Sequence, residues 1–142
     1  MWPQKDLKSY CCHAILMMIA LEKVIGIVLA AKPAQILFEA SNPRHAHEWA
    51  IWREARLPED KILVPGLLTS TSNYVEHPEL VAQRLLQFAD IVGRDRVMAG
   101  TDCGFGTFAG IGKMDAEISW RKLAALVEGT RRASDRLWGR QA

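Results

Sequence analysis

The stretch that decides the fold is Val97-Met98-Ala99-Gly100-Thr101-Asp102-Cys103-Gly104-Phe105-Gly106. Its apolar start is typical of a buried strand, and the glycines around Asp102 and Cys103 leave little bulk to block a metal or a substrate. The end of a strand is where α/β proteins place their chemistry. A small cysteine buried in a turn explains the same residues. The stretch therefore predicts either a functional or a structural cysteine at a strand end.

Helical and strand-like segments alternate on both sides of this stretch. Apolar residues at helical spacing, with prolines and glycines near the ends, predict helices at 21–31, 43–54, 78–92 and 115–138. Short apolar runs predict strands at 35–38, 61–64 and 96–99, and a glycine-rich loop is expected at 100–112. Gly129 is a point at which the last helix could break. This order predicts an α/β protein with parallel strands and right-handed crossovers, either a barrel or a doubly wound sheet.

The first twenty residues fit this alternation poorly. We therefore expect a separate N-terminal segment at 1–20 and one domain at 21–142. A chain of 142 residues can bury a core of its own. The tryptophans on the predicted helices are expected to pack, namely Trp49, Trp52, Trp120 and Trp138.

Charge and cysteine content exclude several classes of protein. The net charge is +2, and the 18 Lys and Arg residues are dispersed except for one adjacent pair at 131–132, so no nucleic-acid footprint stands out. Glu22 and Lys23 interrupt the apolar run at 14–31, which leaves no piece long enough to cross a membrane. The three cysteines have no plausible disulfide pairing, which favours a reducing, cytoplasmic location.

Two potential metal ligands follow predicted strands. Glu39 follows the strand at 35–38, and Cys103 follows the strand at 96–99. Because parallel strands end at one edge, we expect the two side chains to converge there. A thiolate and a carboxylate suit zinc, although a tetrahedral site needs three or four ligands.

Histidines and a cysteine pair offer further donors. His45 and His47 are two residues apart, so on a helix they point away from each other and cannot grip one ion; each is either a substrate contact or a helix-start residue. Cys11-Cys12-His13 is a weaker metal candidate, because adjacent cysteines rarely hold one metal together. His77 precedes Pro78 and is expected to cap or orient a helix start.

Two polar segments have both a functional and a structural explanation. Glu76 and Glu79 could form a catalytic acid pair, but acidic residues at a helix start are expected from the helix dipole alone. The polar residues of 69–73 could bind a polar substrate, and a solvated loop has the same composition.

Taken together and in order, four motifs resemble the cobalamin-independent methionine synthase family, nearest to its short, single-barrel members similar to epoxyalkane:coenzyme M transferase. The resemblance covers about 21–138. The motifs are Phe38-Glu39-Ala40-Ser41-Asn42-Pro43-Arg44-His45, Pro65-Gly66, Glu76-His77-Pro78-Glu79-Leu80-Val81-Ala82 and Gly100-Thr101-Asp102-Cys103-Gly104-Phe105-Gly106.

This resemblance implies a (β/α)8 TIM barrel with a catalytic zinc at the carboxyl ends of its strands. Cys103 matches the cysteine ligand of the last strand, and Glu39 matches a glutamate that binds or adjoins the metal. Asp102 would lie near the metal or contact a substrate amine. Apart from the resemblance, His45 remains a candidate for a catalytic or substrate contact. The implied reaction transfers a methyl or alkyl group to a thiol, as in the transfer from 5-methyltetrahydrofolate to homocysteine.

The chain also departs from the family pattern. Family members carry a His-x-Cys pair on the strand before the helix that here begins near Leu21, and the sequence contains no such pair. Its length accommodates about three of the eight βα units, so the fold expected is the C-terminal part of a barrel.

Three functions therefore remain open. The first is a zinc-dependent thiol methyl- or alkyltransferase, and the second is a catalytically inactive barrel fragment that only binds a partner chain. Self-association through the open barrel edge is expected in both. The third is a hydrolase with Cys103 as nucleophile and His45 as base.

Overall fold

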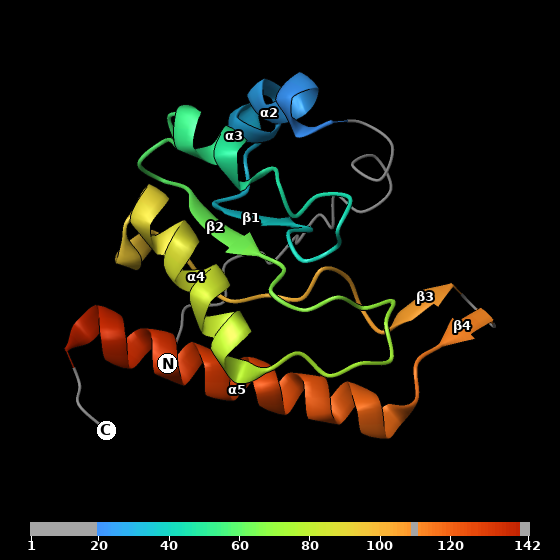
Figure 1. Cartoon of the computed structure of the whole chain (residues 1–142). Helices are drawn as coiled ribbons and strands as arrows, with labels where there is room; N and C mark the ends of the chain where they lie inside the picture. Colours follow the sequence, from blue (N-terminus) through green and yellow to red (C-terminus); the bar gives the residue numbers. More distant parts are fainter. Residues whose placement is uncertain (1–19, 109–110, 140–142) are drawn as a thin grey trace.

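The computed structural model describes residues 20–108 and 111–139 and has mixed α/β architecture with a small parallel sheet (Figure 1). Strands β1 (Gln35–Phe38) and β2 (Ile62–Pro65) run parallel, with Gln35 opposite Ile62 and Phe38 opposite Pro65. The other elements are α2 (Leu21–Ala30), α3 (Trp49–Glu54), α4 (Pro78–Val92), the 3-10 helix η1 (Arg94–Arg96), β3 (Gly106–Phe108), β4 (Ile111–Lys113) and α5 (Ala116–Trp138). The α/β class and the parallel strand direction are confirmed.

The third predicted strand is interrupted. Residues 97–100 lie parallel to β2 and pair with it only through isolated bridges, Leu63 with Val97 and Gly66 with Gly100. The N–H of Met98 donates to the Leu63 carbonyl at 2.8 Å, and the N–H of Gly100 donates to the Pro65 carbonyl at 3.0 Å. Between these two bonds a regular ladder needs an N–H from residue 65, which proline lacks. Pro65 thus breaks the ladder without displacing the segment.

The second predicted helix is shorter than expected. Regular helix begins at Trp49, and residues 43–48 form hydrogen-bonded turns instead. The Asn42 carbonyl accepts from the N–H groups of His45 and Ala46, both at 2.8 Å. Because the Asn42 side chain also accepts from the Arg44 N–H, the chain starts in a turn held by asparagine.

Helices α4 and α5 agree with their predicted ranges. The side chain of His77 caps α4 by accepting from the Glu79 N–H at 3.1 Å, which confirms its predicted role. Asp115 caps α5 through the Glu117 N–H at 2.8 Å. The expectation of a break at Gly129 is wrong, because α5 continues through it. A Cβ at this position would lie 2.5 Å from the Val81 Cβ, so glycine is needed for close packing of α5 on α4.

Two apolar clusters form the core, and the Val97 side chain packs against both. In the first, the Phe38 ring lies 4.7 Å from that of Trp52 and 5.6 Å from that of Phe88. The second joins the loop after β2 to α4 and α5. Trp120 is 71% exposed, so the expectation that it packs is wrong. Trp138 is 49% exposed, and the Arg94 guanidinium lies 3.9 Å from the centre of its ring.

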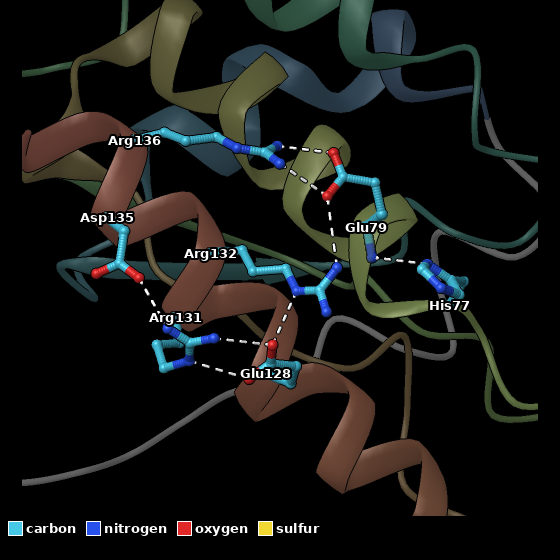
Figure 2. Close-up of polar contacts among 7 residues, drawn as sticks. All are labelled: His77, Glu79, Glu128, Arg131, Arg132, Asp135 and Arg136. Atoms are coloured by element: carbon cyan, nitrogen blue, oxygen red, sulfur yellow. Dashed lines mark hydrogen bonds and ion pairs between the residues drawn. The ribbon is translucent and has the colours of Figure 1, made fainter. Parts of the chain in front are cut away.

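A surface network of ion pairs also joins α4 to α5 (Figure 2). Arg136 holds Glu79 with two hydrogen bonds of 2.8 Å, and Arg132 lies 3.7 Å from the same carboxylate. Along α5, Glu128 pairs with both Arg131 and Arg132, and these two arginines lower its pKa to about 2. The adjacent arginine pair is thus neutralised within the helix surface, as expected of a solvated face.

The predicted glycine-rich loop contains a hairpin. Strands β3 and β4 pair antiparallel, with Gly106 opposite Lys113. In the sequence, these two strands follow Cys103 and precede α5. In the ranges that the structure covers, no helix is both long and apolar enough to cross a bilayer.

Candidate functional site

Three chain segments meet at the carboxyl edge of the parallel strands. They are the residues after β1, the loop after β2 and the Asp102-Cys103 pair after the third segment. Gly66 makes the close approach feasible, since a Cβ there would collide with the Cα and Oδ1 of Asp102. The N–H of Asp102 donates to the Leu68 carbonyl at 3.0 Å, which fixes the third segment beside the second.

Cys103 lies between a hydroxyl and a carboxylate. Its Sγ is 2.7 Å from the Ser70 Oγ and 3.5 Å from the Glu39 Oε1. Burial raises the pKa of the thiol to about 11, against a lowering by the Ser70 hydrogen bond and with a further increase from the charge of Glu39. Glu39 and Cys103 therefore converge as their strand ends predict, and without a cation the sulfur is a neutral thiol at pH 7.

Asp102 connects the third segment to the loop after β1. Its Oδ1 accepts from the backbone N–H groups of Ala40 and Ser41, each at 2.9 Å, whereas its buried Oδ2 has no hydrogen-bond partner. Burial raises the pKa of Asp102 to about 6, and the two backbone donors oppose that increase. Asp102 thus holds the backbone next to Glu39 in place.

Arg84 on α4 contacts both the loop after β1 and the loop after β2. Its guanidinium donates to the Ser41 Oγ and to the Leu67 carbonyl, both at 3.0 Å, and Ser41 in turn donates to the Gly66 carbonyl at 2.8 Å. Sequence reasoning missed Arg84 and Ser41. The available signal was an arginine on the otherwise apolar stripe of α4.

His45 and His47 lie in different environments. His45 is buried, and its Nδ1 lies 2.9 Å from the Glu48 Oε2. The other oxygen of Glu48 accepts from the Leu21 N–H at 3.0 Å, so this pair holds the start of α2. His47 is exposed. The contact that the structure gives His45 is with Glu48 rather than with the sulfur of Cys103.

Glu76 and Glu79, which the sequence left open as an acid pair, have different partners. Glu76 is 3% exposed and forms a 2.7 Å ion pair with the fully buried Lys122 of α5, whereas Glu79 contacts Arg136 at the surface. Glu76 also accepts from the Thr69 N–H at 2.8 Å and from the Thr69 hydroxyl at 3.1 Å. Glu76 is thus engaged in holding the loop after β2.

The donors available to a metal are few in the described ranges. Glu39 and Cys103 offer an oxygen and a sulfur of the types that zinc binds. Within residues 20–108 and 111–139, however, no group of three or more His, Cys, Asp or Glu side chains is placed to hold an ion. Cys11, Cys12 and His13 lie outside the described residues. The visible donors fit zinc in type and supply half of a tetrahedral set.

The fold is similar to part of a known enzyme. The solved structure of a B12-independent methionine synthase from Shewanella sp. W3-18-1, in complex with selenomethionine, matches 83% of this chain with a TM-score of 0.69 and 20% identity. The matched part is 31% of that enzyme, so this chain spans less than a third of its length. Comparisons with protein-family models and with curated proteins give no match. At this identity the likeness shows the fold, which a methionine synthase shares over that part of its length.

Proposed function

We propose that this chain is part of a zinc-dependent thiol methyl- or alkyltransferase of the methionine synthase type, with the arrangement of the C-terminal βα units of a (β/α)8 barrel. The observation that carries the proposal is the approach of Cys103 to Glu39 at the carboxyl edge. The shared fold with a methionine synthase supports it. The thiol acceptor is homocysteine or a related small thiol, and the reducing cytosol is the expected location.

Cys103 and Glu39 are the residues that would hold the zinc ion. Burial and the nearby carboxylate oppose a negative charge on the sulfur, and a cation between the two groups would remove that penalty. Zinc, when bound, holds a thiol deprotonated near neutral pH, which makes it a nucleophile without a separate base. The remaining donors would come from 1–19, from the thiol substrate or from a second chain.

The other residues of the site would shape and orient it. Asp102 fixes the backbone at 40–41 beside Glu39. For Asp102, a contact with a substrate amine remains a prediction. The Ser70 Oγ lies 2.7 Å from the sulfur of Cys103 and would donate to it when the sulfur is a thiolate. For His45, a contact with substrate remains a prediction.

The test is the zinc content of the purified chain together with methyl transfer from 5-methyltetrahydrofolate to homocysteine. We expect near-stoichiometric zinc in the wild type and its loss in Cys103→Ser and Glu39→Gln. Glu54→Gln is the matched control, because it neutralises an exposed carboxylate of α3 that is no proposed ligand. Zinc that persists in Cys103→Ser would reject the assigned site.

An inactive fragment that binds a partner chain is the second candidate. Within the described residues, two side chains and not three or four are placed to bind a metal, which favours this candidate. A groove of about 520 Å³ between the segment at 97–99 and α5, lined by neither Glu39 nor Cys103, favours it as well. Met98 is 47% exposed beside that groove. A wild-type chain without zinc, together with dimers in light scattering, would support this candidate over the enzyme.

A further inference from the structure

The most deeply buried charge in the described residues belongs to Lys122, whose side chain is 0% exposed. Its ammonium reaches from α5 to the loop after β2, where it pairs with Glu76 at 2.7 Å. It also lies 3.5 Å from the Ser72 Oγ and 5.1 Å from the centre of the Tyr74 ring. A buried ion pair contributes little net stability against apolar residues of the same size, because both charges lose their hydration. The role of the Lys122–Glu76 pair is therefore to position the loop after β2 rather than to stabilise the fold.

The geometry connects this ion pair to the candidate site. Glu76 accepts from the N–H and the hydroxyl of Thr69, and that hydroxyl also contacts the Ser72 Oγ. Ser70 is the next residue, is 4% exposed and has its Oγ 2.7 Å from the Cys103 Sγ. The turn that carries Ser70 is thus fixed on one side by the ion pair and on the other by the thiol.

We propose that Lys122 and Glu76 are positioning residues, whose ion pair holds the 69–72 turn so that the Ser70 hydroxyl meets the Cys103 sulfur. The thiol is thereby kept in the orientation that faces Glu39. This positioning role concerns the site of the proposed function. It rests on that function only in that the oriented thiol would then bind zinc. The contact of the Ser70 Oγ with the Cys103 Sγ involves residues of this chain alone, so it can be tested in the metal-free protein.

The orientation of the sulfur has a direct spectroscopic signature. The Raman S–H stretching band of a cysteine shifts when the hydrogen bonds at the sulfur change. In the full chain carrying Cys11→Ser and Cys12→Ser, Cys103 is the one remaining thiol of three. With metal removed by a chelator, the band reports on Cys103 alone.

In this background we expect Lys122→Met to move the band to the position that Ser70→Ala produces. Combining the two substitutions should move it no further, because both act on the same contact. Arg136→Met is the matched control, since it removes a different ion pair of α5, the one with Glu79 of α4, which does not touch the 69–72 turn. It should leave the band unchanged.

A second variant covers the case in which Lys122→Met fails to fold, because it leaves Glu76 buried and charged. Lys122→Met with Glu76→Leu removes both charges together and should fold, as judged by circular dichroism. A folded variant of either kind with the wild-type band would overturn the proposal. So would additive shifts with Ser70→Ala.

The outcome is separate from that of the proposed function. If the wild type transfers no methyl group, the band shift still decides the positioning role. If the wild type does transfer a methyl group, we expect Lys122→Met with Glu76→Leu to reduce turnover about 10- to 100-fold, as for other residues that orient metal ligands. Unchanged turnover in a folded double variant would count against the positioning role while leaving the transfer reaction established.

Discussion

The Oδ1 of Asp102 accepts a 2.9 Å hydrogen bond from the backbone N–H of Ser41, across 61 residues of sequence. The same oxygen accepts from Ala40, so one carboxylate ties the third sheet segment to the loop that carries Glu39. The second oxygen is buried without a partner. This imbalance explains why burial outweighs the two hydrogen bonds and raises the pKa of Asp102 to about 6.

The first prediction concerns the pH dependence of stability. The Asp102 carboxyl has a pKa of about 6 when folded, against an ordinary value of 3.8 that we take for the unfolded chain. Between about pH 4 and pH 6 the folded chain therefore binds more protons than the unfolded chain. Its contribution to stability is full below pH 4 and is lost as the pH rises through 6. The loss amounts to about 3 kcal/mol from a shift of about two units. Urea unfolding at pH 4 and pH 7.5 measures it.

Asp102→Asn should remove this dependence, because the amide carbonyl still accepts from the two N–H groups and carries no charge. As the pH rises from 4 to 7.5, we expect the free energy of unfolding of the variant to increase relative to that of the wild type. Asp115→Asn, at an exposed helix cap, should keep the wild-type profile. Parallel profiles for wild type and Asp102→Asn would contradict the prediction.

The second prediction concerns the reactivity of Cys103. Burial is the main cause that raises the thiol pKa to about 11, and the charge of Glu39 raises it further, so Glu39→Gln should lower that pKa. The pH profile of iodoacetamide alkylation, followed on the Cys103 peptide by mass spectrometry with a chelator present, should shift to lower pH. Glu54→Gln on the exposed face of α3 serves as control. Identical profiles for all three proteins would exclude an effect of Glu39 on the thiol.

The third prediction concerns the packing of α5 on α4. Gly129→Ala places a Cβ 2.5 Å from the Val81 Cβ and 2.6 Å from the Pro78 carbonyl oxygen, so we expect a loss of about 1 to 3 kcal/mol in the free energy of unfolding. Gly26→Ala is the matched control, because it lies in α2 with no atom within 4 Å of the new Cβ. It should stabilise the chain by up to about 1 kcal/mol. A reversed order of the two variants in thermal unfolding would refute the packing argument.

The fourth prediction concerns Glu48, which joins His45 to the start of α2. Glu48→Ala removes the acceptor of the Leu21 N–H and the partner of a buried imidazole, and should lower the free energy of unfolding by about 1 to 3 kcal/mol. Glu22→Ala, exposed in the first turn of α2, should change it by no more than about 0.5 kcal/mol. Equal effects of the two substitutions in urea unfolding would show that the buried contacts of Glu48 are immaterial to stability.

Local signals in the sequence determined the elements and the edge at which the site forms. Proline at the start and glycine after the end set the bounds of α4, and the apolar run 36–38 set β1, because these signals act through the backbone of neighbouring residues. The meeting of Glu39 and Cys103 followed from the parallel direction of the strands.

Only the tertiary structure decided how the site is supported. A lysine is expected at the surface, yet packing of α5 buries Lys122 against Glu76, 46 residues away. Arg84 and Ser41 meet across 43 residues for the same reason, and nothing near either residue in the sequence specifies the contact. Burial also raised the pKa values of Asp102 and Cys103, because loss of hydration depends on which segments pack together and not on which residues are neighbours in the chain.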